Sequence, residues 1–206
     1  MVPNLRKDAL AAVKEALTGA GFAATRSRYM FVQRRSPGVY GWLGLNDNDN
    51  HLPELLIINP VVGVMHERIQ EMISELNPEF DRRGQPVVSC NLGYLMPEKT
   101  YRTWDFFRDG DVRGVASDLA EALSSYGSTF IDVWADWSAL SERIEDTDLL
   151  IDDEKYVVIP VVRVLNGDVK GALRMIGEKK EKIAGSQDVY ASFYGKYAES
   201  FQERFA

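Results

Sequence analysis

The spacing of apolar residues changes along this chain, and the change constrains the fold more than any other feature. Apolar residues recur at helical spacing over 4–19, whereas 28–35 and 39–45 carry short apolar and aromatic runs that are typical of strands. The Ser-Pro-Gly sequence at 36–38 is typical of a turn. The first part of the chain therefore predicts a helix followed by a β-hairpin.

The middle of the chain alternates between the two patterns. Residues 46–50 predict a polar loop, Asn59-Pro60 is expected to end a short strand, and Gly127 is expected to end a helix. The strands expected here are 55–58, 86–95 and 101–107, and the helices are 65–76, 112–127 and 130–144. These elements predict an α+β fold with a mostly antiparallel sheet of roughly four to six strands flanked by helices.

The last quarter of the chain predicts a helical C-terminal region. Residues 154–165 are compatible with either a helix or a strand. Their β-branched residues and Pro160 disfavour a helix, whereas the short turn before 169–182 favours an αα-hairpin. We favour the helix, with Asp168 as the N-cap of the segment that follows. A final helix over 188–205 carries an aromatic stripe, which we expect to be core rather than a ligand site.

Two domains are expected from this organisation. Residues 1–150 would form a mixed α+β domain, and 151–206 would form a helical extension packed on it, so that the two make one structural unit. The first 17 residues lack the apolar run of a secretory signal, and no segment approaches a membrane span. A lone cysteine, Cys90, argues against a disulfide-stapled fold and is interpreted as a small buried hydrophobe. We therefore expect a cytoplasmic protein.

The net charge of −7 is concentrated in one segment. Residues 132–154 contain nine acidic residues and one base, Arg143. Such a chain is a poor candidate for nucleic-acid binding, which needs clustered lysine and arginine, but it would suit a basic protein partner. The alternative is that the acids only keep the protein soluble.

The sequence contains no recognisable catalytic, cofactor or metal motif. His66-Glu67 begins like a zinc-protease helix, but Gln70 stands where the second histidine would be. The Asn-Asp run of 46–50 resembles the start of a calcium loop, yet Leu52 and Ile58 occupy the positions of the required glycine and acid. The pairs Asp132/Asp136 and Asp148/Asp152 would each share a helix face, either as a solvated surface or for acid–base chemistry, a metal or an arginine patch. No cofactor and no catalytic residue is therefore expected.

Two segments mix proline, glycine, polar and large apolar residues in a way that regular elements rarely require. They are 58–66 and 91–97, the second followed by Tyr101, Trp104 and Phe106, and they predict either the lining of a groove or tight connections in the sheet. Five short motifs follow one another in a fixed order: Asn-Pro-Val-Val-Gly-Val at 59–64, Leu-Gly-Tyr-Leu-Met-Pro at 92–97, Trp-Asp-Phe at 104–106, Tyr-Gly at 126–127 and Asn-Gly-Asp at 166–168. In this order of features, over roughly residues 5–175, the chain resembles small bacterial immunity-type proteins of polymorphic toxin systems, including contact-dependent inhibition.

The resemblance implies tight binding to one cognate toxin domain, such as a basic nuclease, and blockage of its active site. The partner-binding residues expected in the acidic segment are Asp132, Trp134, Asp136, Trp137, Glu145, Asp148, Asp152 and Asp153. Two alternatives remain at this point. One is an enzyme that uses acids such as Asp47, Asp49 or Asp132 with His66, and the other is an adaptor whose helical tail binds peptides.

Overall fold

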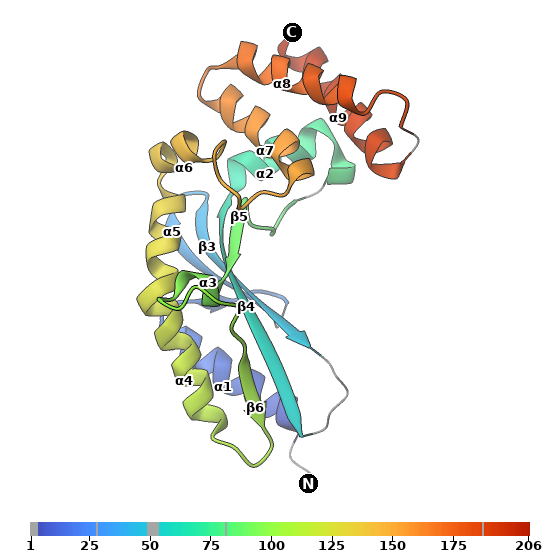
Figure 1. The fold of residues 1–206 in the computed structure, drawn as a ribbon. Helices are drawn as coiled ribbons and strands as arrows, with labels where there is room; N and C mark the ends of the chain where they lie inside the picture. The colour runs from blue at the N-terminus through green and yellow to red at the C-terminus, as the bar shows by residue number, and fades with distance from the viewer. Residues whose placement is uncertain (1–3, 28, 49–53, 81, 187) are drawn as a thin grey trace. The chain divides into compact units, whose positions relative to one another are not determined.

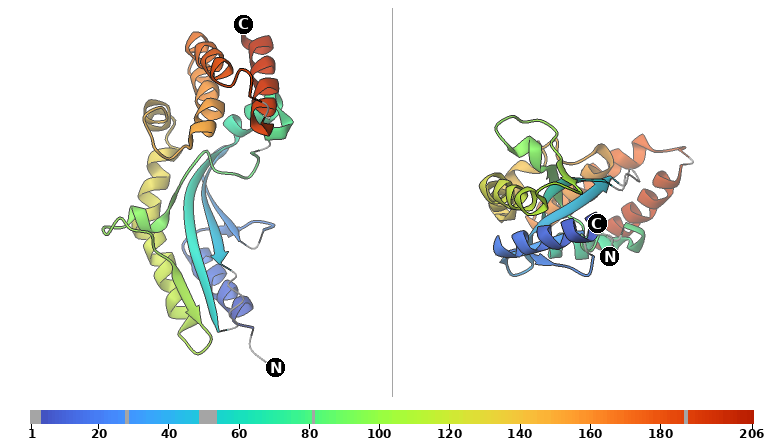
Figure 2. Two further views of the ribbon diagram at one scale, coloured as in Figure 1. Left: turned by 45° about the vertical axis from the view of Figure 1, so that its right-hand side comes forward. Right: turned by 90° about the horizontal axis from the view of Figure 1, so that it is seen from below.

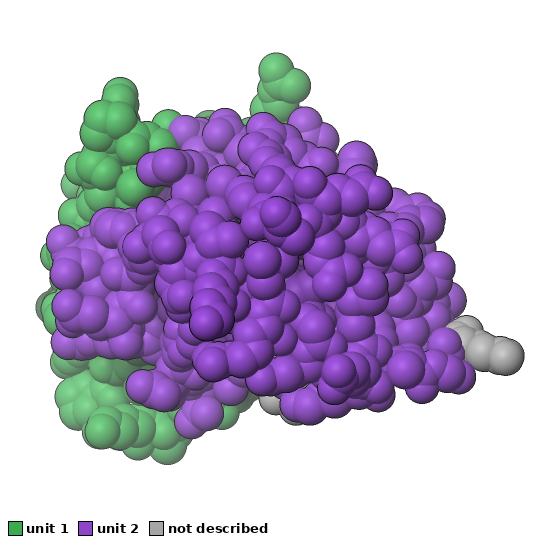
Figure 3. All heavy atoms as spheres, turned by 90° about the horizontal axis from the view of Figure 1, so that it is seen from above, with its two compact units in different colours: residues 1–64, 89–135 green, residues 65–88, 136–206 purple. Residues whose placement is uncertain are grey.

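The structure is a computed structural model that describes residues 4–27, 29–48, 54–80, 82–186 and 188–206 (Figure 1). The chain divides into two compact units (Figure 3). Unit 1 comprises Met1–Val64 and Ser89–Ala135, and unit 2 comprises Met65–Val88 and Asp136–Ala206. The expected boundary at residue 150 therefore lies within unit 2. No helix in the described ranges is long and apolar enough to cross a membrane.

The predicted α+β class is confirmed: a mostly antiparallel sheet is flanked by helices, and the chain ends in helices. In the described part of the chain six strands form one sheet in the order β1-β2-β3-β4-β5, and β6 also pairs with β4. The pairs β1–β2, β2–β3 and β4–β6 are antiparallel, and Phe31 lies opposite Leu43 in the predicted hairpin. The strands are β1 (Ala23–Ala24), β2 (Met30–Ser36), β3 (Val39–Asn48), β4 (Leu55–His66), β5 (Val88–Asn91) and β6 (Trp104–Phe107).

Helices α1 (Leu5–Gly19) and α4 (Val112–Ala122) lie next to each other in unit 1 (Figures 1 and 2). The side chain of Asn4 accepts a hydrogen bond from the backbone N–H of Lys7 and so caps the start of α1. The residues of α1 that are buried recur every four positions, at 5, 9, 13 and 17. This stripe faces the core and explains why the first helix could be predicted from periodicity.

The expected end of the helix at Gly127 is wrong. After α4 the chain continues through a π-helix, η2 (Leu123–Gly127), directly into α5 (Ser128–Ala135). A Cβ atom at Gly127 would lie 2.6 Å from Cδ1 of Leu123 and 3.4 Å from Cγ2 of Val62. The glycine therefore leaves room for the side chain of Leu123 and does not end the helix.

Three strand predictions also need correction. β3 extends to Asn48 through part of the expected polar loop, and β4 runs unbroken through Asn59-Pro60. Proline lacks an N–H donor but keeps its carbonyl, which accepts a hydrogen bond from the side chain of Asn91 at 3.4 Å. The strand expected over 86–95 shortens to β5 and gives way to a short helix, α3 (Leu92–Leu95), because Asn91 caps its first turn through the backbone N–H of Gly93.

Unit 2 is helical apart from the strand ends that enter it. Its helices are α2 (Glu67–Leu76), the 3-10 helix η1 (Pro78–Phe80), α6 (Trp137–Arg143), α7 (Asp152–Leu165), α8 (Val169–Lys182) and α9 (Val189–Phe205). The predicted αα-hairpin is confirmed as α7 and α8, and Asp168 caps α8 by accepting from the N–H of Gly171. The helix expected over 130–144 is instead divided, because Asp136 ends α5 and caps α6.

The proline inside α7 is tolerated because tyrosines of α9 supply hydrogen bonds. Pro160 has no N–H to donate to the carbonyl of Tyr156, four residues earlier. The hydroxyl of Tyr194 donates to that carbonyl at 3.4 Å, and the hydroxyl of Tyr197 donates to the next carbonyl, that of Val157, at 2.8 Å. The hydroxyl of Tyr194 thus binds the carbonyl that lacks a helical donor because of Pro160, and the hydroxyl of Tyr197 adds a hydrogen bond at the next carbonyl.

The prediction that this stripe is core is confirmed for three of its five aromatic residues. Tyr194, Tyr197 and Phe201 are completely buried, and the ring centroids of consecutive members lie 5.7 and 5.9 Å apart, whereas Tyr190 and Phe193 are half-buried. Burial raises the pKa of all three tyrosines that point toward α7, namely Tyr190, Tyr194 and Tyr197, above the usual value of 10.0.

These raised pKa values predict a loss of stability at alkaline pH. The folded protein keeps the tyrosines protonated, whereas the unfolded chain ionises them near pH 10.0, so their contribution is complete below that pH and declines above it. Above pH 10 we expect the free energy of unfolding to fall by about 1.4 kcal/mol per pH unit for each such tyrosine. Urea unfolding at a series of pH values checks this, and a Tyr197→Phe variant should show a shallower slope. An identical slope in the variant would contradict the prediction.

Candidate functional site

A groove in unit 1 lies along α5 and is formed with η2 and α3; we call it the α5 groove. Its volume is about 360 Å³. The helical contributors recur at 126, 129, 130, 133 and 134, which is one face of a continuous helix. The lining residues are Leu95, Ser125, Tyr126, Thr129, Phe130, Val133 and Trp134.

The groove depends on local backbone features on both sides. The π-helix η2 places an extra residue in a turn just before α5, and such insertions recur at functional sites. On the other side Gly93 lets α3 pack tightly, since a Cβ atom there would lie 2.4 Å from the carbonyl oxygen of Thr100. This close approach holds Leu95, the residue that α3 contributes to the groove.

The aromatic residues differ in how accessible they are. Trp134 is only 7% exposed and forms part of the wall, with its ring centroid 6.2 Å from that of Phe130. Tyr126 and Phe130 are half-buried, so each presents part of its ring to the groove. An exposed tyrosine, Tyr94, belongs to α3 itself. The groove therefore combines a buried aromatic wall with accessible aromatic edges.

Two of the residues predicted to bind a partner belong to α5 in unit 1. Trp134 lines the groove, as described, whereas Asp132 does not line it. The carboxylate of Asp132 is exposed and lies 3.3 Å from the guanidinium of Arg35 on β2. The structure therefore assigns these two residues to different faces of the same helix.

The other predicted residues belong to unit 2, where most have a structural partner. Trp137 donates from Nε1 to the side chain of Asn166 at 2.9 Å, and Asp136 caps α6. The carboxylates at 145 and 153 form ion pairs with Arg163 at 2.5 Å and with Lys179 at 3.0 Å. Asp148 is exposed, and the side chain of Asp152 lies outside the described residues. Three of these five predicted acidic residues thus cap a helix or form an ion pair within unit 2.

The residues of the enzyme hypothesis lie in different parts of the chain. His66 is buried at the end of β4 in unit 2, with its ring centroid 6.0 Å from that of Trp137. Asp47 belongs to unit 1 and forms an ion pair with Arg6, and Asp49 lies outside the described residues. Within the described ranges no group of three or more histidine, cysteine or acidic side chains is placed to hold a metal ion.

Cys90 is half-buried rather than fully buried as expected, and burial raises the pKa of its thiol. A raised pKa lowers the thiolate fraction, which is the opposite of what a nucleophilic cysteine needs. Of the two segments expected to line a groove, 91–97 contributes through Leu95. Trp104 and Phe106 are instead core residues, at 2% and 0% exposure.

Sequence reasoning missed the contribution of Tyr126, Phe130 and Val133 to a site. Phe130 and Val133 already share a face of the helix expected over 130–144, whereas Tyr126 joins that face only if the helix continues past Gly127. Comparison of the chain with protein-family models, curated proteins and solved structures gave no match.

Proposed function

We propose that this protein binds a protein partner as an immunity-type inhibitor of a cognate toxin domain, and that the α5 groove receives the partner. The single observation that carries the proposal is the aromatic lining of that groove, with Tyr126 and Phe130 partly accessible beside Trp134. Tyrosine and tryptophan in a well-packed apolar depression are the residues that most often dominate the binding energy of protein interfaces.

The acidic surface has a separate role in this proposal. Glu145 and Asp153 already form ion pairs within unit 2, so the binding free energy that they could add as contacts with a partner is small. The net charge of −7 still attracts a basic partner over distances comparable with the Debye length. The acids would therefore raise the rate of association, while the groove would set the rate of dissociation.

The proposal is tested by neutralisation in cells and by affinity. The tagged protein is used to capture its partner from its own organism, and the partner is then expressed alone and together with this chain. We expect the partner to stop growth when it is alone and growth to return when both are present. Phe130→Asp should abolish this rescue and raise the Kd by about 30-fold or more, since it places a charge in an apolar contact.

A matched control is available in the same unit. Phe107 on β6 is 54% exposed and lies outside the groove, so Phe107→Asp introduces the same change elsewhere. This variant should rescue growth and bind as the wild type does. Circular dichroism establishes that both variants are folded. A folded Phe130→Asp protein that still rescues growth would rule out the groove as the interface, and a partner that is harmless alone would rule out the immunity function.

A further inference from the structure

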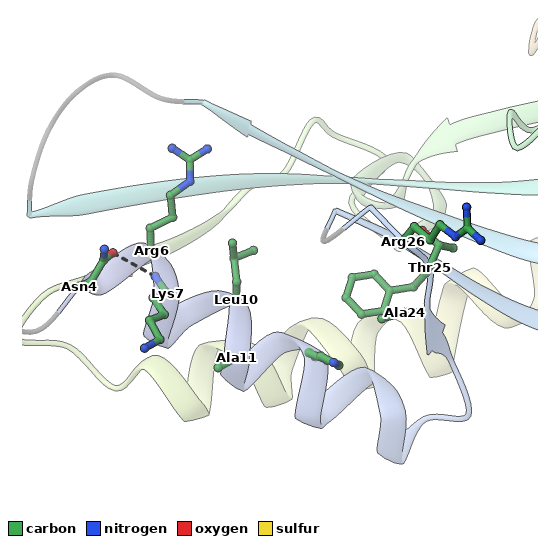
Figure 4. A pocket seen from close by; sticks show the side chains of 10 residues that line it. Asn4, Arg6, Lys7, Leu10, Ala11, Ala24, Thr25 and Arg26 are labelled. Atoms are coloured by element: carbon green, nitrogen blue, oxygen red, sulfur yellow. Dashed lines mark hydrogen bonds between the residues drawn. The ribbon is translucent and has the colours of Figure 1, made fainter.

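Unit 1 contains a second cavity. Its lining residues lie between positions 4 and 31, whereas those of the α5 groove lie between positions 95 and 134. This second cavity lies between α1 and the chain that runs from β1 into β2, and its volume is about 390 Å³ (Figure 4). Figure 4 shows Lys7 and Leu10 on α1, and Ala24, Thr25 and Arg26 on the segment across from them. A volume of this size is within the range that holds small organic ligands, roughly 300–1,000 Å³.

Cationic side chains gather at this cavity, which we call the cationic pocket. Lys7 and Lys14 are seven residues apart on one face of α1, and Arg26 follows β1. All three are exposed, and within the described residues none of them forms an ion pair. A fourth cation, Arg6, is engaged with Asp47 and with the hydroxyl of Tyr29.

Among the described residues that line the cationic pocket there is no carboxylate, although the chain as a whole carries a net charge of −7. Three lining cations without an ion pair in the described part of the chain favour a ligand with more than one negative charge. Lysine binds phosphate as a point charge, and arginine offers two parallel N–H donors to it.

The cationic pocket also has an apolar side. Phe31 of β2 is 1% exposed, and it lines the cavity together with Leu10 and Ala24. Phe31 forms the buried floor of this side, whereas the half-buried Leu10 and Ala24 have surface that an apolar group could remove from water. A ligand that fits both sides must carry charge at one end and an apolar body at the other.

We propose that the cationic pocket binds a small phosphate monoester that carries an apolar group. The phosphate lies against Lys14 and Arg26, and the apolar group lies against Leu10 and Ala24, above the floor that Phe31 forms. This site is separate from the α5 groove, so the proposal stands or fails independently of partner binding.

Titration calorimetry with phenyl phosphate tests the proposal, because that molecule joins a dianion to an apolar ring. We expect saturable binding at millimolar or lower concentration. Benzoate carries one charge less, and phenol and inorganic phosphate each lack one of the two features, so each should bind at least about tenfold more weakly. Equal affinity for phenol would show that the charges contribute nothing, and equal affinity for inorganic phosphate would show that the apolar side contributes nothing. Either result would overturn the proposal.

The double variant Lys14→Glu/Arg26→Glu should lower the affinity for phenyl phosphate by at least about tenfold. Both side chains are exposed, so the fold should persist. The matched control is Arg113→Glu/Lys170→Glu, which changes the net charge equally at two exposed positions away from the cavity and should bind as the wild type does. The same loss of affinity in both double variants would mean that net charge alone governs binding and would overturn the proposal. So would the absence of any binding by the wild type.

Discussion

Replacing Tyr197 with alanine should lower the free energy of unfolding by about 3–5 kcal/mol, the usual cost of removing a buried aromatic side chain. The ring is completely buried, and its hydroxyl donates to the carbonyl of Val157 beside the proline of α7. The conservative change Tyr197→Phe removes only that hydrogen bond and should cost about 1 kcal/mol. Urea unfolding followed by circular dichroism measures both values.

A surface tyrosine provides the comparison for this result. Tyr94 is 50% exposed, so Tyr94→Ala should change the free energy of unfolding by no more than about 0.5 kcal/mol. If Tyr197→Phe costs as little as the surface change, the hydrogen bond to the carbonyl of Val157 does not stabilise α7.

Replacing Gly93 with alanine should also destabilise the protein, by about 1–3 kcal/mol, because the new methyl group meets backbone rather than a flexible side chain. A Cβ atom at this position would lie 2.4 Å from the carbonyl oxygen of Thr100 and 2.7 Å from the backbone nitrogen of Arg102. Relief requires a shift of α3, which carries Leu95 into the α5 groove. Partner binding should therefore weaken together with stability.

Gly177 is the matched control, since it lies inside α8 and a Cβ atom there would meet nothing within 4 Å. Gly177→Ala should stabilise the protein by about 1 kcal/mol, because alanine has the higher helix propensity. Both variants add one methyl group to a helical glycine, and their effects should have opposite signs. If Gly93→Ala proves neutral or stabilising, the close packing of α3 is not required.

The candidate site could be predicted only in part. Trp134 was identified from the acidic segment and does line the groove, whereas Asp132 on the same helix pairs with Arg35 on another face. The spacing of residues in the sequence shows which face of a helix each one occupies only when the first and last residues of that helix are known. An end at Gly127 separates Ser125 and Tyr126 from Phe130, Val133 and Trp134, although all of them lie along one continuous helical stretch.

The elements whose causes are local follow from the amino-acid sequence alone. An amphipathic stripe and the cap at Asn4 define α1, and the cap at Asp168 after a short turn defines the αα-hairpin. Tertiary structure decided the elements where a local signal competes with packing: Pro60 remains in a strand, Pro160 remains in a helix, and Gly127 continues one. Each of these residues usually interrupts regular structure, because it lacks a donor or a side chain. At Pro160 the deficit is offset by the hydroxyl of Tyr194, a group far away in the sequence, which no local pattern can reveal.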